Sequence, residues 1–181
     1  PVSLNPADGF LLSANNRPTD SGTPVGYFFS PDDRMVRMRE ILTEKGKVGI
    51  DDIKELQRDV YMKSSVELRD ALLPRIAEVD PVEPSARRVV SLLKDWDGHY
   101  KADSQGAVAF EMFYAAFKAR FYEGLLGDED GQTYAGVGRI KSLLIADMER
   151  ADADITADAV RHALDRTANG ISKFANWGEM H

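Results

Sequence analysis

The most apolar segment of the chain reads DSQGAVAFEMFYAAFKARFYEGLLG over residues 103–127. Asp103 and Ser104 supply a helix start, and Gly124 or Gly127 supplies an end. Between them, apolar side chains recur at helical spacing at Val108, Phe110, Phe113, Ala116, Phe117 and Phe121. The segment therefore predicts a long, largely buried helix.

Further helical patterns precede this segment. Residues 30–33 read Ser-Pro-Asp-Asp, which is typical of a helix start, and Gly46 ends that pattern. A second start at Gly49 leads into helical spacing that continues to Ile76, with Pro74 as a kink or a break. After a Pro-rich linker, apolar residues again recur at the spacings of one helix face, at Val89, Leu92, Leu93 and Trp96.

The segments that follow residue 127 are more polar. Residues 128–131 read Asp-Glu-Asp-Gly, and we expect a solvated acidic loop there. Helical spacing then returns around Val137–Arg150 and again around Thr156–Lys173. These patterns add two helices, for a total of five to seven.

The first thirty residues differ from the rest because Pro and Gly interrupt them repeatedly. Phe10–Leu12 and Val25–Phe29 read as short strands separated by a polar loop. The sequence therefore predicts a mainly α fold, with a strand–loop–strand segment at residues 1–30 and a helical domain at residues 31–181.

Composition excludes several classes of protein. The 181 residues include 23 Lys and Arg against 30 Asp and Glu, which gives a net charge of −7. This acidic balance argues against a nucleic-acid partner, which usually meets a basic surface. The chain has no Cys, so disulfides, thiolate metal sites and Cys nucleophiles are excluded. No apolar run approaches the length of a membrane span, so no membrane partner is expected.

No metal or cofactor motif is matched. The acidic residues 128–131 do not fit an EF-hand register, because Leu126 falls where the first Asp belongs. The pair Gly136 and Gly138 lacks the third Gly of a dinucleotide loop. The His residues are far apart in the sequence. We therefore expect no cofactor.

The polar residues after Phe10–Leu12 allow two interpretations. Asn15 and Asn16 carry side-chain amides, which donate N–H groups to a developing oxyanion without losing a proton. Asn-Asn before Arg-Pro is also ordinary turn chemistry. The residues alone favour the turn and leave the catalytic interpretation open.

Four blocks of sequence, taken in order, resemble the penicillin amidase family. They are NPADGF at 5–10 leading into ANNRP at 14–18, LQRD at 56–59 leading into LLP at 72–74, WDG at 96–98 with DSQGA at 103–107, and WGEMH at 177–181. The resemblance spans nearly the whole chain, and the WDG and DSQGA pair is its most specific part.

The resemblance implies an N-terminal-nucleophile hydrolase. In this family a precursor is cleaved to expose a Ser at the start of the large chain, and the Ser attacks an amide to form an acyl-enzyme. This sequence resembles an internal piece of that large chain, and Pro1 has no hydroxyl with which to attack. We therefore expect a fragment that is inactive alone, with the other small- and large-chain segments as its partners.

The resemblance also implies roles for single residues. Asn15 matches the oxyanion-hole Asn of the family, and Arg34 matches an Arg near the substrate mouth that organises this Asn or meets a substrate carboxylate. The alternative for Arg34 is an exposed first-turn side chain beside Asp32 and Asp33. The calcium-binding Asp of the family aligns near Thr23, so the resemblance predicts no calcium ligand at that position.

By resemblance, the parent protein is periplasmic or extracytoplasmic and acts on a small-molecule amide. The competing hypothesis is a self-contained, non-catalytic helical interaction module, which the helical patterns and the acidic surface also fit.

Overall fold

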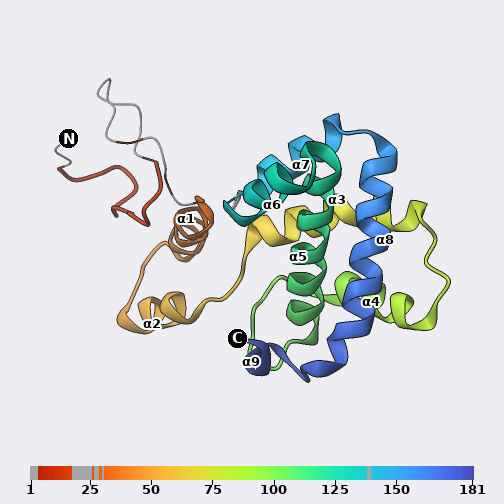
Figure 1. Cartoon of the computed structure of the whole chain (residues 1–181). Coiled ribbons are helices and arrows are strands. Elements are labelled where there is room, and N and C mark those ends of the chain that lie inside the picture. The colour runs from red at the N-terminus through yellow and green to blue at the C-terminus, as the bar shows by residue number, and fades with distance from the viewer. Residues whose placement is uncertain (1–3, 18–25, 27–28, 30, 138–139) are drawn as a thin grey trace. The chain divides into compact units, whose positions relative to one another are not determined.

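The computed structural model describes residues 4–17, 26, 29, 31–137 and 140–181. Within these residues the chain forms nine α-helices and one 3-10 turn (Figure 1). They are α1 (Asp33–Lys45), α2 (Ile50–Arg58), α3 (Lys63–Glu78), α4 (Pro84–Asp95), α5 (Gln105–Leu126), α6 (Asp128–Val137), α7 (Lys141–Arg150), α8 (Ala153–Gly170), η1 (Ile171–Lys173) and α9 (Trp177–Met180). The mainly α class is confirmed, with more helices than the sequence predicted.

The chain packs as two compact units, Pro1–Tyr61 and Met62–His181. The first unit contains α1 and α2, and the second contains α3 to α9. The helices α1 and α2 therefore belong to the same compact unit as the N-terminal residues. The predicted division into domains at residues 1–30 and 31–181 stays a prediction.

The described N-terminal residues contain no strand, so the strand predicted at Phe10–Leu12 is wrong. Leu11 is 71% exposed, and a turn precedes it in which the Gly9 amide donates to the Pro6 carbonyl at 2.9 Å. A strand requires a hydrogen-bonded neighbour, and the described part of this unit pairs no segment with this stretch. The second predicted strand, Val25–Phe29, lies mostly outside the described residues.

The connection between α1 and α2 follows the sequence signals. Gly46 ends α1 with a positive φ of 66°, and Gly49 precedes the first residue of α2. The Gly49 amide donates to the Asp52 carboxylate at 2.8 Å, and Lys45 Nζ contacts the same carboxylate at 2.5 Å. These two contacts hold the pKa of Asp52 below its ordinary value, the lysine contributing more than the amide.

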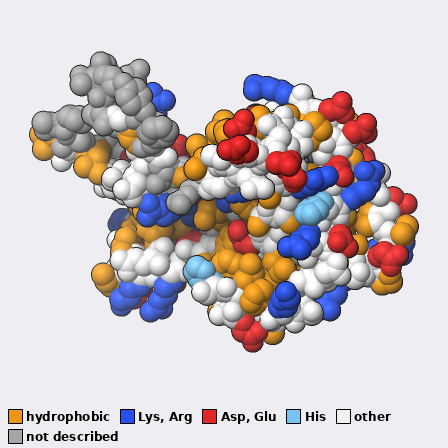
Figure 2. All heavy atoms as spheres, in the orientation of Figure 1, with side chains coloured by type: hydrophobic (Ala, Val, Ile, Leu, Met, Phe, Trp, Pro, Cys, Tyr) orange, Lys and Arg blue, Asp and Glu red, His pale blue; other side chains and the backbone are white. Residues whose placement is uncertain are grey.

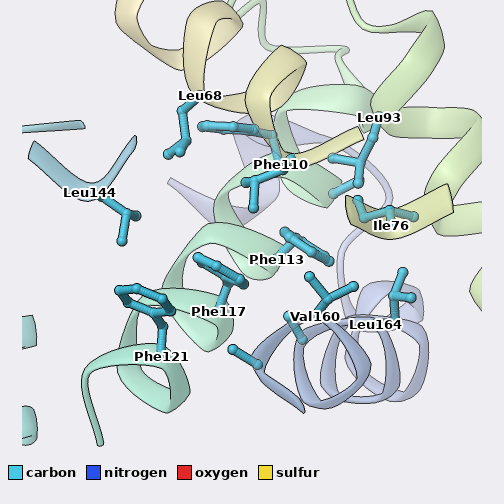
Figure 3. Packing of buried hydrophobic residues seen from close by; sticks show 14 of the residues in the cluster. Leu68, Ile76, Leu93, Phe110, Phe113, Phe117, Phe121, Leu144, Val160 and Leu164 are labelled. Carbon is cyan, nitrogen blue, oxygen red and sulfur yellow. The ribbon is translucent and has the colours of Figure 1, made fainter. Parts of the chain in front are cut away.

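The second unit is built around α5. The Ser104 hydroxyl accepts a hydrogen bond from the Ala107 amide at 3.0 Å and caps the helix, which ends at Gly127. Figure 3 shows the phenylalanine side chains of α5 within the buried cluster. The ring of Phe117 stacks between those of Phe113 and Phe121, with centroid separations of 6.1 and 5.5 Å. Burial of such rings supplies the main stabilisation of this unit.

Helices α3 and α4 contribute the side chains that complete this core on one side. Leu68, Leu72 and Ile76 of α3 are buried, and so are Val89 and Leu93 of α4. α3 continues through Pro74, so the proline does not divide the predicted helical segment. The linker predicted after this helix is present between α3 and α4.

The acidic loop predicted at residues 128–131 is wrong, because these residues form the first turn of α6. Carboxylates are favourable at a helix N-terminus, where the backbone N–H groups point toward them. Gly131 lies against the backbone of α5, and an added Cβ would come within 2.5 Å of the Tyr122 carbonyl oxygen. This close approach allows α5 and α6 to pack as a tight hairpin.

The two helices predicted near the C-terminus are present, with shifted starts. α7 begins at Lys141 rather than near Val137, and α8 begins at Ala153, capped by Asp152, whose side chain accepts from the Asp154 amide at 2.8 Å. α8 buries its apolar face against α5. On the face of the helical part in Figure 2, acidic and basic side chains are interspersed.

Candidate functional site

The candidate site begins in the loop that carries Asn15. Ala14 is buried at 7% exposure, whereas Asn15 is exposed and takes a left-handed backbone conformation with φ of 60°. Non-glycine residues seldom adopt this conformation, and Asn tolerates it better than most. The loop thus buries the side chain of Ala14 and exposes the side chain of Asn15 to solvent.

Arg34, in the first turn of α1, contacts this loop directly. Its Nη2 donates to the Asn15 side-chain oxygen at 3.0 Å and to the Ala14 carbonyl at 3.1 Å. The structure therefore brings together the two residues that the sequence singled out.

The arginine also determines which way the Asn15 amide faces. A guanidinium has only donors, so the atom opposite it must be the carbonyl oxygen of the side-chain amide. The Asn15 Nδ2 group then faces away from Arg34, and it has no hydrogen-bond partner among the described residues. Such an N–H group is chemically able to donate to an oxyanion.

The LQRD block, residues 56–59, has a structural role at the end of α2. Asp59 accepts from Arg37 of α1 at 2.9 and 2.8 Å, and its other oxygen accepts from the Tyr61 amide at 2.8 Å. The guanidinium of Arg37 also lies 4.8 Å from the centre of the Tyr61 ring. This contact links α1 to the end of α2. Burial disfavours the charged form of Arg37, but the hydrogen bond and the charge of Asp59 help to outweigh it, so the pKa of Arg37 is raised.

The WDG block, residues 96–98, shapes the turn that follows α4. Trp96 is buried and its Nε1 donates to the His99 carbonyl at 3.0 Å, while Asp97 accepts from the His99 amide at 3.0 Å. Gly98 takes a positive φ of 83°. The Trp96 ring stacks on the Phe110 ring of α5, with the ring centroids 4.8 Å apart. The WDG block therefore packs the turn against the core.

The WGEMH block, residues 177–181, packs at the start of α5. The Trp177 amide donates to the Ser104 carbonyl at 3.1 Å, and the Gly178 amide donates to the Ala102 carbonyl at 2.8 Å. The Trp177 ring meets the Tyr100 ring edge-on at 5.1 Å. The WDG, DSQGA and WGEMH segments thus lie together at the start of α5 and stabilise the fold there.

Sequence reasoning missed a polar chain beside this end of α5. Tyr100 donates to the Glu111 carboxylate, and the Tyr100 hydroxyl lies 3.0 Å from the hydroxyl of the buried Ser65. Burial is the main cause that raises the pKa of Tyr100, and the charge of Glu111 adds to it. No spacing in the sequence relates these three residues, because they come from three separate segments.

Metal-ligating side chains do not cluster in the part of the chain that the structure describes: it brings no three His, Asp or Glu residues together in a suitable group. Thr23, which aligns with the calcium-binding Asp, lies outside the described residues. In the same described part, no helix combines the length and the apolarity that crossing a membrane requires.

Comparison with known proteins identifies the family. The family model described as penicillin amidase matches residues 1–181, which is the whole chain. No curated protein matches the chain. The match covers all four blocks that carried the resemblance, including the loop with Asn15. The chain therefore belongs to the penicillin amidase family.

Proposed function

We propose that this chain is part of an acylase that hydrolyses linear amides through an acyl-enzyme, with its N-terminal Ser nucleophile in another segment of the parent protein. Membership of the penicillin amidase family supports an amide hydrolase. The observation that carries the assignment to this loop is the 3.0 Å hydrogen bond from Arg34 to the Asn15 side-chain oxygen.

In the proposed mechanism, Asn15 stabilises the charge that develops on the scissile carbonyl oxygen. Attack by the nucleophile turns this oxygen into an oxyanion, and the Asn15 Nδ2 group donates a hydrogen bond to it. One such preorganised donor lowers the barrier by roughly 3–4 kcal/mol. Arg34 fixes the amide before the substrate arrives, so little reorganisation accompanies the reaction.

The parent protein is proposed to be extracytoplasmic, and its other segments are the proposed partners of this chain. Large apolar side chains are exposed on α6 at Tyr134 and Val137 and at the start of α7 at Ile140 and Leu143. Exposed apolar side chains of this kind are suited to burial against further protein. The chain on its own is expected to lack activity, because the proposed mechanism takes its Ser nucleophile from another segment of the parent protein.

A chromogenic acyl amide tests this function. The intact parent protein should hydrolyse it, and the 181-residue chain alone should not. Asn15→Ala in the parent should lower kcat by about 10²–10³-fold, because one oxyanion donor is lost.

Asn169→Ala is the matched control. Asn169 is an exposed Asn on α8 that donates to Asp165 one turn earlier in the same helix, so this variant should keep the wild-type rate. Turnover by the chain alone, or a wild-type rate for folded Asn15→Ala, would contradict the proposal.

A further inference from the structure

Asn16, the neighbour of the proposed oxyanion residue, uses both ends of its side-chain amide within the loop. Its Oδ1 accepts from the Ala14 amide at 3.1 Å, and its Nδ2 donates to the Arg17 carbonyl at 3.2 Å. The side chain therefore spans the backbone on both sides of Asn15. The Arg17 carbonyl thus takes one of the two N–H donors of the Asn16 amide, and its oxygen is taken by the Ala14 amide.

The residue before Asn15 is consequently held at both of its backbone polar groups. Asn16 accepts from the Ala14 amide, and Arg34 donates to the Ala14 carbonyl at 3.1 Å. Ala14 is also buried. The backbone that enters Asn15 is thus held by two side chains, Asn16 from within the loop and Arg34 from α1.

The Asn15 backbone itself needs such support. Its φ of 60° lies in the left-handed region, which costs free energy for a residue other than Gly. A loop in this conformation relaxes unless neighbouring contacts hold it. Relaxation would turn the Asn15 side chain away from Arg34 and misplace its N–H group.

We infer that Asn16 is a positioning residue for the oxyanion donor: it holds the Ala14 amide and thereby sets the backbone from which Asn15 projects. The inference rests on the proposed function of Asn15. Asn16 acts through Asn15 and does not touch the substrate. Arg34 orients the Asn15 amide group, whereas Asn16 orients the backbone that carries it.

A double-mutant cycle in the intact parent protein tests this role. Asn16→Ala alone should lower kcat by about 10–100-fold, because misplacing a catalytic group by about 1 Å costs rate on this scale. KM should change by less than about threefold, because uniform binding is untouched. In an Asn15→Ala background, Asn16→Ala should lower kcat by less than about twofold, because residues that act as a unit are not additive.

The outcomes separate the inference from the proposed function. If Asn15→Ala keeps the wild-type rate, the proposed function fails. If Asn15→Ala is slow but Asn16→Ala keeps the wild-type rate, or the two losses multiply, the positioning role alone is overturned. A merely structural role would lower the unfolding midpoint and leave kcat per folded molecule unchanged.

A second substitution covers the case in which Asn16→Ala does not fold. Asn16→Ser keeps a polar side chain, but its oxygen lies one bond closer to the backbone and has no second arm for the Arg17 carbonyl. It should show the same loss of kcat and the same non-additivity with Asn15→Ala. Additive losses for this variant would overturn the role equally.

Discussion

The two units of the chain are stabilised in different ways. In the second unit, buried apolar side chains from α3 to α8 form one contiguous core. Among the described residues of the first unit, only Ala14 and Leu42 are buried apolar residues, and its helices and loop are joined by ion pairs and hydrogen bonds. Apolar burial thus stabilises the second unit, whereas polar contacts from α1 hold the loop of the first unit that carries Asn15.

Loss of a buried aromatic ring should destabilise the second unit more than any other substitution considered for its stability. Phe117→Ala should lower the free energy of unfolding by about 3–5 kcal/mol, because a fully buried ring leaves a cavity. Leu11→Ala in the first unit should change it by less than about 0.5 kcal/mol, since Leu11 is 71% exposed.

Denaturant unfolding of the 181-residue chain, followed by tryptophan fluorescence for the second unit and by helical circular dichroism for both units, measures this difference. Both tryptophans, Trp96 and Trp177, lie in the second unit, so the fluorescence signal reports on that unit. A loss below about 1 kcal/mol for Phe117→Ala, against the expected cost of a buried cavity, would break the distinction between the two units.

A smaller effect is expected where α5 passes close to the WDG turn. Gly106→Ala should destabilise the second unit by about 1–3 kcal/mol, because the new Cβ would lie 2.6 Å from the Trp96 Cβ. Gly136→Ala is the matched control in α6, where a Cβ meets nothing within 4 Å, and it should be neutral or stabilising. The same fluorescence measurement distinguishes them, and equal midpoints for the two variants would show that the close approach does not constrain α5.

The smallest effect concerns a polar contact inside the apolar unit. The buried Tyr122 hydroxyl donates to Asp147 at 2.8 Å, and its pKa is raised, first by burial and then by that hydrogen bond. Above about pH 10 the unfolded chain loses this proton while the folded chain keeps it, so stability falls as pH rises.

Tyr122→Phe should therefore cost about 0.5–1.5 kcal/mol at pH 8 and make the decline toward pH 11 shallower. Unfolding midpoints of the wild type and the variant at both pH values provide the measurement. Parallel declines in the two proteins would mean that Tyr122 does not contribute to the pH dependence.

Much of the second unit was predictable, because its helices carry their own local signals. The apolar spacing of α5, its Ser104 cap and its terminal Gly127 are all encoded within one segment. The first turn of α6 was not predictable from the sequence, because a run of acidic residues is compatible with both a loop and a helix N-terminus. What favours the helix is the fit of Gly131 against the α5 backbone, a contact that no local pattern reveals.

The candidate site was less predictable from local sequence patterns than the helices of the second unit. The residues alone left Asn15 as a turn residue or an oxyanion donor, and only the family resemblance favoured the donor. The contact with Arg34 spans 19 positions along the chain, and helical periodicity does not relate a loop residue to a first-turn residue. The strand predicted at Phe10–Leu12 failed for a related reason, since a strand depends on a neighbour that the segment itself does not specify.

Asn15→Asp in the intact parent protein tests whether Asn15 serves as an N–H donor held by Arg34. The carboxylate keeps an acceptor for Arg34 and nearly the same shape, but it has no N–H to donate. We expect an unchanged unfolding midpoint and a loss of kcat of at least about 100-fold. A folded variant that retains the wild-type kcat would show that Asn15 is not the oxyanion donor.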